Sequence, residues 1–265
     1  MHKLSAVLIT RDAAGSLPAC LASLGFCDEM LVVDAGSTDD TLAIARQAGA
    51  RIIETHWRGF GPQKQFAVEQ ASHDWVLCID ADEQVTPELA ATIQAVLSAG
   101  RPSGRKRPEE AAPTFSCYQF SRRNQFMGRY LRHGEGYPDW SLRLFDRRHA
   151  RWSEDAVHER VIATGEVGTL AGDLLHDSAE SLERYLDKQN RYSSLAAEAA
   201  IKNGKRSSAP RLLISPVIRF IKFYLLRAGF RDGLPGLVHI LIGCYASFAK
   251  HAKMLAYQIS STDKK

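Results

Sequence analysis

The sequence has few cysteines, no long hydrophobic run and only a small excess of one charge. Its five cysteines are odd in number and form no CxxC pair. Neither a disulfide framework nor a zinc site is therefore expected, and we expect reduced thiols in the cytosol. The formal net charge of +4 does not indicate a nucleic-acid partner. No segment shows the ~20 consecutive apolar residues of a spanning helix, and residues 1–5 lead directly into an apolar run without room for a signal peptide.

What is present is a regular alternation of apolar runs and helical segments. Strands are predicted at Leu4–Thr10, Met30–Val33 and Arg51–Glu54. Helices are predicted between them, starting near Ser16 and Thr41. Hydrophobic residues make up 45% of the 265 residues, enough for a sizeable core. This β-α-β-α-β order predicts a parallel sheet with right-handed crossovers.

The most informative stretch follows a fourth apolar run. Val76–Ile79 is predicted as a buried strand, and Asp80, Asp82 and Glu83 come directly after it. In open α/β sheets, ligands bind where strands end. Asp80 and Asp82 are two residues apart, so on an extended chain their carboxylates would point the same way and suit Mg²⁺ or Mn²⁺ holding a diphosphate. The alternative is that these acids only solvate a turn before the helix predicted at Pro87–Ser98.

Two later features are candidates for chemistry. Pro62–Gln70 is predicted as a helix, and Lys64 near its start would make an anion site or be an ordinary solvent-facing lysine. Val157–Ile162 is predicted as a strand in which Glu159 shares the inner face with two valines. A carboxylate in that position is explained by a functional role or by a buried ion pair.

The rest of the chain divides into a loop-rich part and a helical part. Further strands are predicted at Phe115–Ser121 and Ser141–Phe145, and the aromatic- and glycine-rich loop Asn124–Asp139 between them would face an acceptor. Gly100–Pro113 is expected to be a flexible surface loop without chemistry. After His176 the pattern becomes helical, with helices predicted at residues 181–202, 210–227 and 234–257.

These pieces together resemble the family 2 glycosyltransferases of the GT-A fold. The resemblance covers about residues 4–165 and is most specific in VVDAGSTDDT and DWVLCIDADE. The stretches WRGFGPQKQFA, PDWSLRLF and VHE look most like the bacterial enzymes that add β-1,4-linked glucose to the inner core of lipopolysaccharide or lipooligosaccharide. The resemblance implies an α/β fold with a GT-A (Rossmann-like), mostly parallel sheet flanked by helices. Residues 1–175 would be the catalytic domain, and residues 176–265 a C-terminal helical extension.

The resemblance also implies roles for individual residues. Asp82 would hold the divalent metal, Mg²⁺ or Mn²⁺. Glu159 would be the catalytic base, and Asp155 of the Glu154–Asp155 pair stays open as the alternative. The other implied roles are donor-nucleotide binding by Thr10, Asp12, Asp34, Lys64 and Asp80, and binding of an anionic acceptor by Arg132, Arg143, Arg147 and Arg148.

The implied reaction is an inverting transfer of a sugar, with glucose from UDP-glucose expected, to the lipopolysaccharide inner core. One alternative is transfer to another lipid-linked or cell-surface glycan. A nucleotidyltransferase is disfavoured because the loop ITRDAAGSL has a single glycine. A non-catalytic sugar-nucleotide-binding membrane protein is disfavoured because Asp80, Asp82 and Glu83 are all present.

The C-terminal helices predict a location. Segments 210–227 and 234–257 are apolar with basic residues at intervals, which is typical of helices that lie in a membrane interface. We expect a cytoplasmic protein, peripherally associated with the inner face of the cytoplasmic membrane, where a lipid-linked saccharide acceptor would lie. The alternative is that these helices pack on the catalytic domain or form a dimer.

Overall fold

The structure, a computed structural model, describes residues 2–98, 115–155, 159–178 and 181–262. The predicted loop Gly100–Pro113, and positions 157 and 158 of the predicted strand, lie outside these residues. Contacts divide the chain into an N-terminal unit, Met1–Arg122 with Asp139–Asp177, and a helical unit, Arg123–Pro138 with Ser178–Lys265. Segment 123–138 thus groups with the C-terminal helices, and the assignment of residues 1–175 as the catalytic domain stays a prediction.

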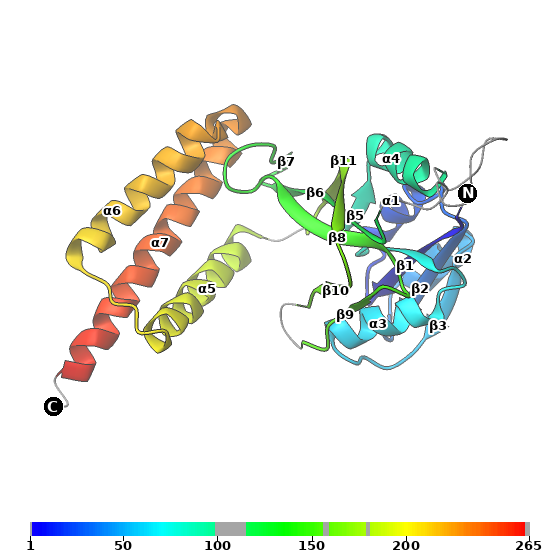
Figure 1. Cartoon of the computed structure of the whole chain (residues 1–265), viewed down its shortest axis with the longest axis horizontal. Coiled ribbons are helices and arrows are strands. Elements are labelled where there is room, and N and C mark those ends of the chain that lie inside the picture. Colours follow the sequence, from blue (N-terminus) through cyan, green and yellow to red (C-terminus); the bar gives the residue numbers. More distant parts are fainter. Residues whose placement is uncertain (1, 99–114, 156–158, 179–180, 263–265) are drawn as a thin grey trace. The chain divides into compact units, whose positions relative to one another are not determined.

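Half of the main sheet is parallel, as the sequence predicts. Its strands lie in the order β3-β2-β1-β4, and each neighbouring pair is parallel. Helices α1, α2 and α3 connect them in turn (Figure 1). The bounds are β1 Leu4–Thr10, α1 Leu17–Ala22, β2 Glu29–Asp34, α2 Thr41–Gln47, β3 Arg51–Glu54, α3 Phe60–Gln70 and β4 Trp75–Cys78.

The other half of the sheet makes it mixed. The order continues β4-β8-β6-β11-β5, and the pairs β4–β8, β8–β6 and β11–β5 are antiparallel. The sequence did not predict β5, β7, β9 or β11, and β7 falls within the loop predicted at Asn124–Asp139. A short strand, β7, pairs with the end of β6, and β9 and β10 form a separate two-stranded sheet. The bounds are β5 Glu83–Val85, α4 Pro87–Ser98, β6 Cys117–Phe126, β7 Arg129–Tyr130, β8 Asp139–Asp146, β9 Ala150–Trp152, β10 Val161–Ala163 and β11 Val167–His176.

The core of the N-terminal unit lies on both faces of this sheet. In β1, Leu4 and Leu8 pack into one buried cluster with residues of α1 and α4, whereas Val7 packs into the opposite cluster with Ala67 and Val68 of α3. Successive strand residues point to opposite faces, so a strand buried on both sides is a continuous apolar run. The helices on both faces leave the carboxyl ends of the parallel strands as the place for a site.

The helical unit has three long helices and a small core. Helix α7 packs against both α5 and α6 (Figure 1). One described apolar cluster consists of Ala197, Ala200 and Met254, and Ile240 of α7 is buried as well. The bounds are α5 Leu182–Lys202, α6 Ala209–Phe220, a π-helical segment η2 Ile221–Leu226, a 3-10 turn η3 Gly229–Asp232 and α7 Gly233–Thr262.

The segment that contains α7 has a high mean hydropathy, although polar residues interrupt its apolar runs. By length and composition, Gly229–Ser260 could cross a membrane, and 33% of its most apolar window is buried inside the protein. This property is a mean hydropathy over a window, so the absence of ~20 consecutive apolar residues stands, and peripheral association stays a prediction.

Candidate functional site

Two loops at the carboxyl ends of β1 and β2 are joined by hydrogen bonds. The backbone N–H of Asp12 donates to Oγ of Ser37 (2.8 Å), and the N–H of Thr38 donates to Oδ1 of Asp12 (2.7 Å). The N–H of Ala13 donates to Oγ1 of Thr41 (2.8 Å). Asp12 has a φ of +50°, in the left-handed region that Asp tolerates better than most residues. The two loops therefore form one connected rim above the sheet.

The carboxylate of Asp34 accepts hydrogen bonds from the end of β1 and from the loop after β2. Its side chain is fully buried and accepts hydrogen bonds from the hydroxyls of Thr10 (2.8 Å) and Ser37 (2.5 Å). It also accepts from the backbone N–H groups of Gly36 (2.9 Å) and Ser37 (2.8 Å). Burial raises the pKa of Asp34, but these hydrogen bonds outweigh it and the pKa lies below its usual value. Thr10 and Asp34 are buried, whereas Asp12 is exposed. Nucleotide binding by all three residues stays a prediction.

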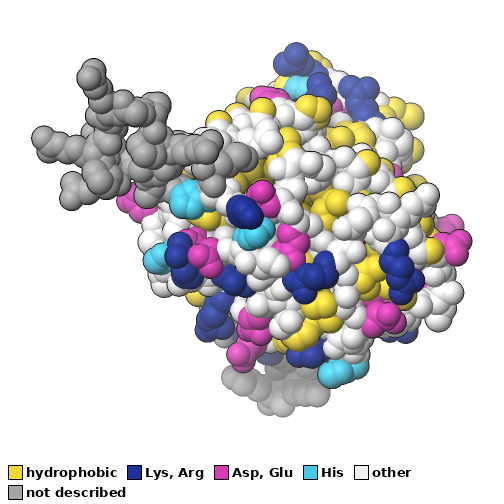
Figure 2. All heavy atoms as spheres, turned by 90° about the vertical axis from the view of Figure 1, so that its right-hand side faces the viewer, with side chains coloured by type: hydrophobic (Ala, Val, Ile, Leu, Met, Phe, Trp, Pro, Cys, Tyr) yellow, Lys and Arg dark blue, Asp and Glu magenta, His cyan; other side chains and the backbone are white. Residues whose placement is uncertain are grey.

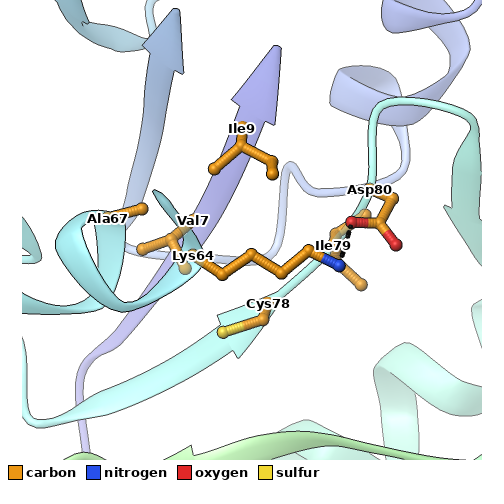
Figure 3. A pocket seen from close by; sticks show the side chains of 7 residues that line it. All are labelled: Val7, Ile9, Lys64, Ala67, Cys78, Ile79 and Asp80. Atoms are coloured by element: carbon orange, nitrogen blue, oxygen red, sulfur yellow. Dashed lines mark ion pairs between the residues drawn. The ribbon is translucent and has the colours of Figure 1, made fainter. Parts of the chain in front are cut away.

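Lys64 lies between two acids, Asp80 after the end of β4 and Glu159 before β10. Figure 3 shows its side chain extending from α3 past Val7 towards Asp80. Its Nζ lies 2.9 Å from Oδ1 of Asp80 and 3.2 Å from Oε1 of Glu159. The Nζ also lies 4.8 Å from the centre of the Trp152 ring. Lys64 is buried, so the alternative of an ordinary solvent-facing lysine is wrong.

Asp80 lies between two cations. Its Oδ2 accepts from the Arg143 guanidinium at 2.7 Å, opposite Lys64. Burial raises the pKa of Asp80, but Arg143 and Lys64 lower it well below the usual range. Arg143 also lies 3.3 Å from Oε1 of the fully buried Glu83, which Arg122 approaches at the same distance. Arg143 is thus buried and paired with Asp80 and Glu83. This position does not favour its predicted contact with an acceptor.

Asp82 does not lie beside Asp80 in the predicted way. The N–H of Glu83 donates to the carbonyl oxygen of Asp80 (2.9 Å), so residues 80–83 form a turn. The expectation of an extended chain with both carboxylates on one side is therefore wrong. Oδ2 of Asp82 instead lies 3.4 Å from Nε2 of His176 at the end of β11. No sequence pattern indicated a role for this histidine, because β11 was not predicted and His176 is far from Asp82 along the chain.

Asp82 and His176 are two residues that could contribute ligands to a divalent metal. Among residues 2–98, 115–155, 159–178 and 181–262, no three His, Cys, Asp or Glu side chains form a group that could hold a metal ion. Mg²⁺ sites in phosphate-handling enzymes commonly use only one or two protein ligands and take the rest from substrate phosphates and water. A pair with one carboxylate oxygen and one imidazole nitrogen fits a site that a diphosphate completes.

Glu159 and the backbone of Ser153 and Asp155 lie against the start of α3. The predicted strand is shorter than expected: β10 begins at Val161, so Glu159 lies before it and strand alternation does not explain its position. A Cβ on Gly61 of α3 would collide with the carbonyl oxygen of Ser153 and lie 3.4 Å from Cβ of Glu159. Asp155, the alternative base, is exposed. Glu159 is therefore connected to Asp80 through Lys64, which forms an ion pair with each of the two carboxylates.

The other predicted acceptor residues lie elsewhere. Arg147 donates to the carbonyl oxygens of Val68 (3.2 Å) and Ala71 (2.6 Å), at the end of α3. Arg148 pairs with Asp146 at 2.6 Å. Because Asp146 pairs with Trp75 at the start of β4, both arginines lie at the end of β4 opposite to Asp80, and acceptor binding by them stays a prediction. Arg132 belongs to the helical unit, where its side chain is exposed and its N–H donates to Asp232 (2.9 Å).

The site therefore combines a rim of backbone and hydroxyl groups, a buried lysine between two carboxylates, and an Asp–His pair at one strand end. Comparison with known proteins defines the class. The family described as Glycosyl transferase family 2 matches residues 5–151. The mixed sheet with flanking helices is the arrangement expected of a GT-A fold, and the predicted fold class is confirmed.

Similar proteins extend the match over nearly the whole chain. The lipopolysaccharide core biosynthesis glycosyltransferase LpsC of Rhizobium meliloti (strain 1021) is 31% identical over 95% of this chain and 91% of its own length. An uncharacterized glycosyltransferase of Rickettsia prowazekii (strain Madrid E) is 30% identical over 98% and 89%. Glucosyl-3-phosphoglycerate synthase from Mycobacterium tuberculosis, solved with Mn²⁺, uridine-diphosphate and glucosyl-3-phosphoglycerate, is 21% identical over 47% of this chain and 44% of that chain, with a TM-score of 0.34. The chain belongs to glycosyltransferase family 2.

Proposed function

We propose that the protein is an inverting hexosyltransferase that moves glucose from UDP-glucose to the inner core of lipopolysaccharide. The observation that carries the proposal is the line of charges Asp80–Lys64–Glu159 at the end of β4, with Asp82 and His176 beside it. The near full-length similarity to LpsC, whose name gives lipopolysaccharide core biosynthesis, supports the acceptor. Transfer to another lipid-linked or cell-surface glycan is the second candidate, since a 31% identity leaves room for a different acceptor.

The donor side has to accommodate a diphosphate that gains negative charge as it leaves. The loops joined through Asp12 lie at the edge where donors bind in α/β sheets, and Lys64 brings a positive charge to the same edge. Asp82 and His176 would hold the divalent ion, Mg²⁺ or Mn²⁺, which supplies charge neutralisation for the diphosphate when bound. Arg143 and Lys64 keep Asp80 ionised, so its oxygens can only accept hydrogen bonds, as a ribose hydroxyl would require.

The acceptor side needs a base. In one displacement, the bond from the anomeric carbon to the donor phosphate oxygen breaks, the bond to the acceptor oxygen forms, and the hydroxyl proton moves to a carboxylate. We assign this proton to Glu159, whose position is fixed by its ion pair with Lys64. Asp155 is the competing assignment, because Glu154–Asp155 matches the Glu-Asp pair that the family resemblance implies and Asp155 is exposed.

The proposed acceptor also implies a place in the cell. A lipid-linked saccharide at the inner face of the cytoplasmic membrane would require the enzyme to work at that surface. We propose a cytoplasmic enzyme that is peripherally associated with the membrane, rather than one anchored by a spanning segment.

A donor screen tests the function directly. Purified protein is incubated with deacylated core oligosaccharide and one nucleotide sugar at a time, and the product is read by mass spectrometry. We expect the mass of one hexose to be added from UDP-glucose, and Asp82→Ala, as the matched control, to add none. Addition from another donor would correct the sugar, and no addition from any donor would overturn the proposed acceptor.

A further inference from the structure

Helix α6 and the π-helical segment after it leave an apolar face uncovered. No residue of either segment is buried. Val217, Ile221 and Leu225 follow one another at four-residue spacing and are 55%, 43% and 54% exposed. They share a face with further exposed apolar side chains, namely Leu213, Ile214 and Ile218. A helix this apolar that packs on α7 and still has no buried residue leaves one apolar face without a partner among the described residues.

Helix α7 carries a second exposed apolar stripe. Leu234, Leu241, Tyr245 and Phe248 recur at helical spacing and are 65%, 49%, 50% and 42% exposed. The contacts of α7 use other positions. Ser247 shares a 2.7 Å hydrogen bond with Ser215 of α6, and Lys253 donates to Asn190 and Ser193 of α5. The stripe therefore stays exposed although α7 packs on both α5 and α6.

A groove of about 430 Å³ lies between the two helices on the side of the α6 face. Two residues of its wall, Ile214 and Ile218, belong to that face, and His251 comes three residues after Phe248 of the α7 stripe. The complete lining is Pro210, Arg211, Ile214, Ser215, Ile218 and His251. The groove is thus apolar with a basic residue at its rim, a combination that suits an acyl chain below an anionic headgroup.

The charge of this region is of one sign. Residues 201–262 contain ten of the 34 Lys and Arg of the chain but only one of its 30 Asp and Glu. That one acid, Asp232, is 1% exposed, whereas Arg211, Lys222 and Arg227 are exposed beside the apolar face. The face of the molecule seen in Figure 2 is different, since basic and acidic side chains are interspersed on it. A basic region with an apolar face is complementary to an anionic bilayer and not to another basic protein surface.

We propose that the outer face of α6 and η2, with the α7 stripe and the groove between them, docks on an anionic phospholipid bilayer. The apolar side chains enter the boundary between headgroups and acyl chains, and Arg211, Lys222 and Arg227 meet lipid phosphates. Arg219 takes no part, because its guanidinium is paired with the carboxylate of Glu135. The proposal rests on the proposed function only for its purpose, since bilayer binding is measured without donor or acceptor.

Vesicle sedimentation tests the docking face with the full chain. Protein is mixed with preformed vesicles of phosphatidylcholine, with or without phosphatidylglycerol, and centrifuged at low and high salt. The charge variant reverses the three exposed basic residues, Arg211→Glu, Lys222→Glu and Arg227→Glu. Its matched control reverses three exposed basic residues of the N-terminal unit, Lys3→Glu, Arg46→Glu and Arg151→Glu. The apolar variant is Val217→Ser, Ile221→Ser and Leu225→Ser, and its control replaces three exposed leucines of α5, Leu182→Ser, Leu186→Ser and Leu195→Ser.

We expect wild type and both controls to sediment with vesicles that contain phosphatidylglycerol and to be released by salt or carbonate. The charge and apolar variants should each lose about tenfold or more in partitioning, with unchanged circular dichroism. Equal partitioning of variants and controls would overturn the proposal. So would retention in carbonate, which indicates a spanning helix, or a wild-type dimer that the apolar variant splits and that does not sediment. Loss of transfer with intact sedimentation would instead count against the proposed function alone.

Discussion

The N-terminal unit buries charges in pairs of opposite sign, whereas residues 201–262 of the helical unit expose basic residues and no acid. In the first, Lys64 and Arg143 lie within 3 Å of Asp80. In the second, Lys222 and Arg227 lie at the surface beside exposed apolar side chains. Taking charges out of water is unfavourable unless partners are placed with good geometry, while exposed basic residues act by attraction at a distance. Changes in the first unit should therefore alter chemistry, and changes in the second should alter location.

The largest effect is expected at the proposed metal site. Asp82→Ala removes the carboxylate of the Asp82–His176 pair, so transfer should fall to background. A chelator should do the same to the wild type, and Mn²⁺ or Mg²⁺ should restore it, as followed by release of the nucleoside diphosphate. Vesicle binding of the variant should be unchanged. Full activity in chelator would show that the pair does not act through a metal.

Glu159→Gln should lower turnover by roughly 10²–10⁴-fold, the usual contribution of a general base. Donor affinity, measured by calorimetry with the nucleoside diphosphate, should change little, because the base acts on the acceptor proton. Asp155→Asn is the matched variant, since Asp155 belongs to the same segment and is exposed. If Asp155→Asn is the inactive enzyme and Glu159→Gln is near normal, the base is Asp155.

Gly61→Ala should reduce turnover by about 10- to 100-fold, because the new Cβ would push away the backbone of Ser153 and with it the segment of Glu159. Gly15→Ala is the control, since a Cβ there meets nothing within 4 Å. Steady-state kinetics on both variants, with circular dichroism to check folding, makes the comparison. Normal kinetics of Gly61→Ala would show that the segment moves without consequence.

A smaller effect, on stability alone, is expected at Glu29. This residue begins β2, at the end of the strand opposite to Asp34. Its carboxylate accepts from Ser5 (2.5 Å), Ser72 (2.8 Å) and Arg51 (2.9 Å). Burial raises the pKa of Glu29, but these hydrogen bonds lower it to about 2. The stabilisation is present above the unfolded pKa of ~4.3 and is lost as the pH falls towards about 2.

Glu29→Gln should therefore lower the free energy of unfolding by about 1–3 kcal/mol at pH 7. The difference from wild type should shrink as the pH falls below ~4. Urea unfolding at several pH values measures both, and Glu54→Gln, at an exposed ion pair of 3.7 Å, is the control. A difference that does not depend on pH would mean that the carboxylate charge is not what stabilises the sheet.

The smallest effect is expected for the charge-reversed helical unit acting on a water-soluble acceptor. Arg211→Glu, Lys222→Glu and Arg227→Glu together should leave transfer to deacylated oligosaccharide within about twofold of wild type, since exposed charges there make no contact with the proposed chemistry. The same kinetic assay measures this. A large loss would contradict the separation of chemistry and location between the two units.

The sequence predicts best the elements whose signals are local. Strand β1 is a continuous apolar run, and β4 is another, because both are buried on two faces. Helix α4 has the predicted bounds, since Pro87 fixes its first turn and the hydroxyl of Thr86 accepts from the N–H of Leu89 (3.3 Å). The positions of Thr10 and Asp80, which are predicted on the donor side, follow from these strands, because a strand end places its last residue and the residues after it at the sheet edge.

What could not be predicted depends on contacts distant in sequence. Strand β11 contains Gly168 and Gly172, which weaken a strand signal. The ring of Tyr118 and the backbone of Leu89 approach them so closely that a Cβ would collide. No local pattern reveals such neighbours, and so the partner of Asp82 was missed. Strand β5 begins with a buried Glu83, whose burial depends on arginines from β6 and β8.

Trp152 gives the protein an internal optical probe. Its indole N–H points to Sγ of Cys78 at 3.3 Å, and its ring lies 4.8 Å from Nζ of Lys64 and 5.5 Å from the Arg143 guanidinium. The emission of an indole responds to nearby charge, and Trp152 is 3% exposed, so water contributes little to that response. Any event that moves these two cations relative to the ring will change the fluorescence of Trp152. Stopped-flow emission can thus time the arrival and departure of a donor without a label.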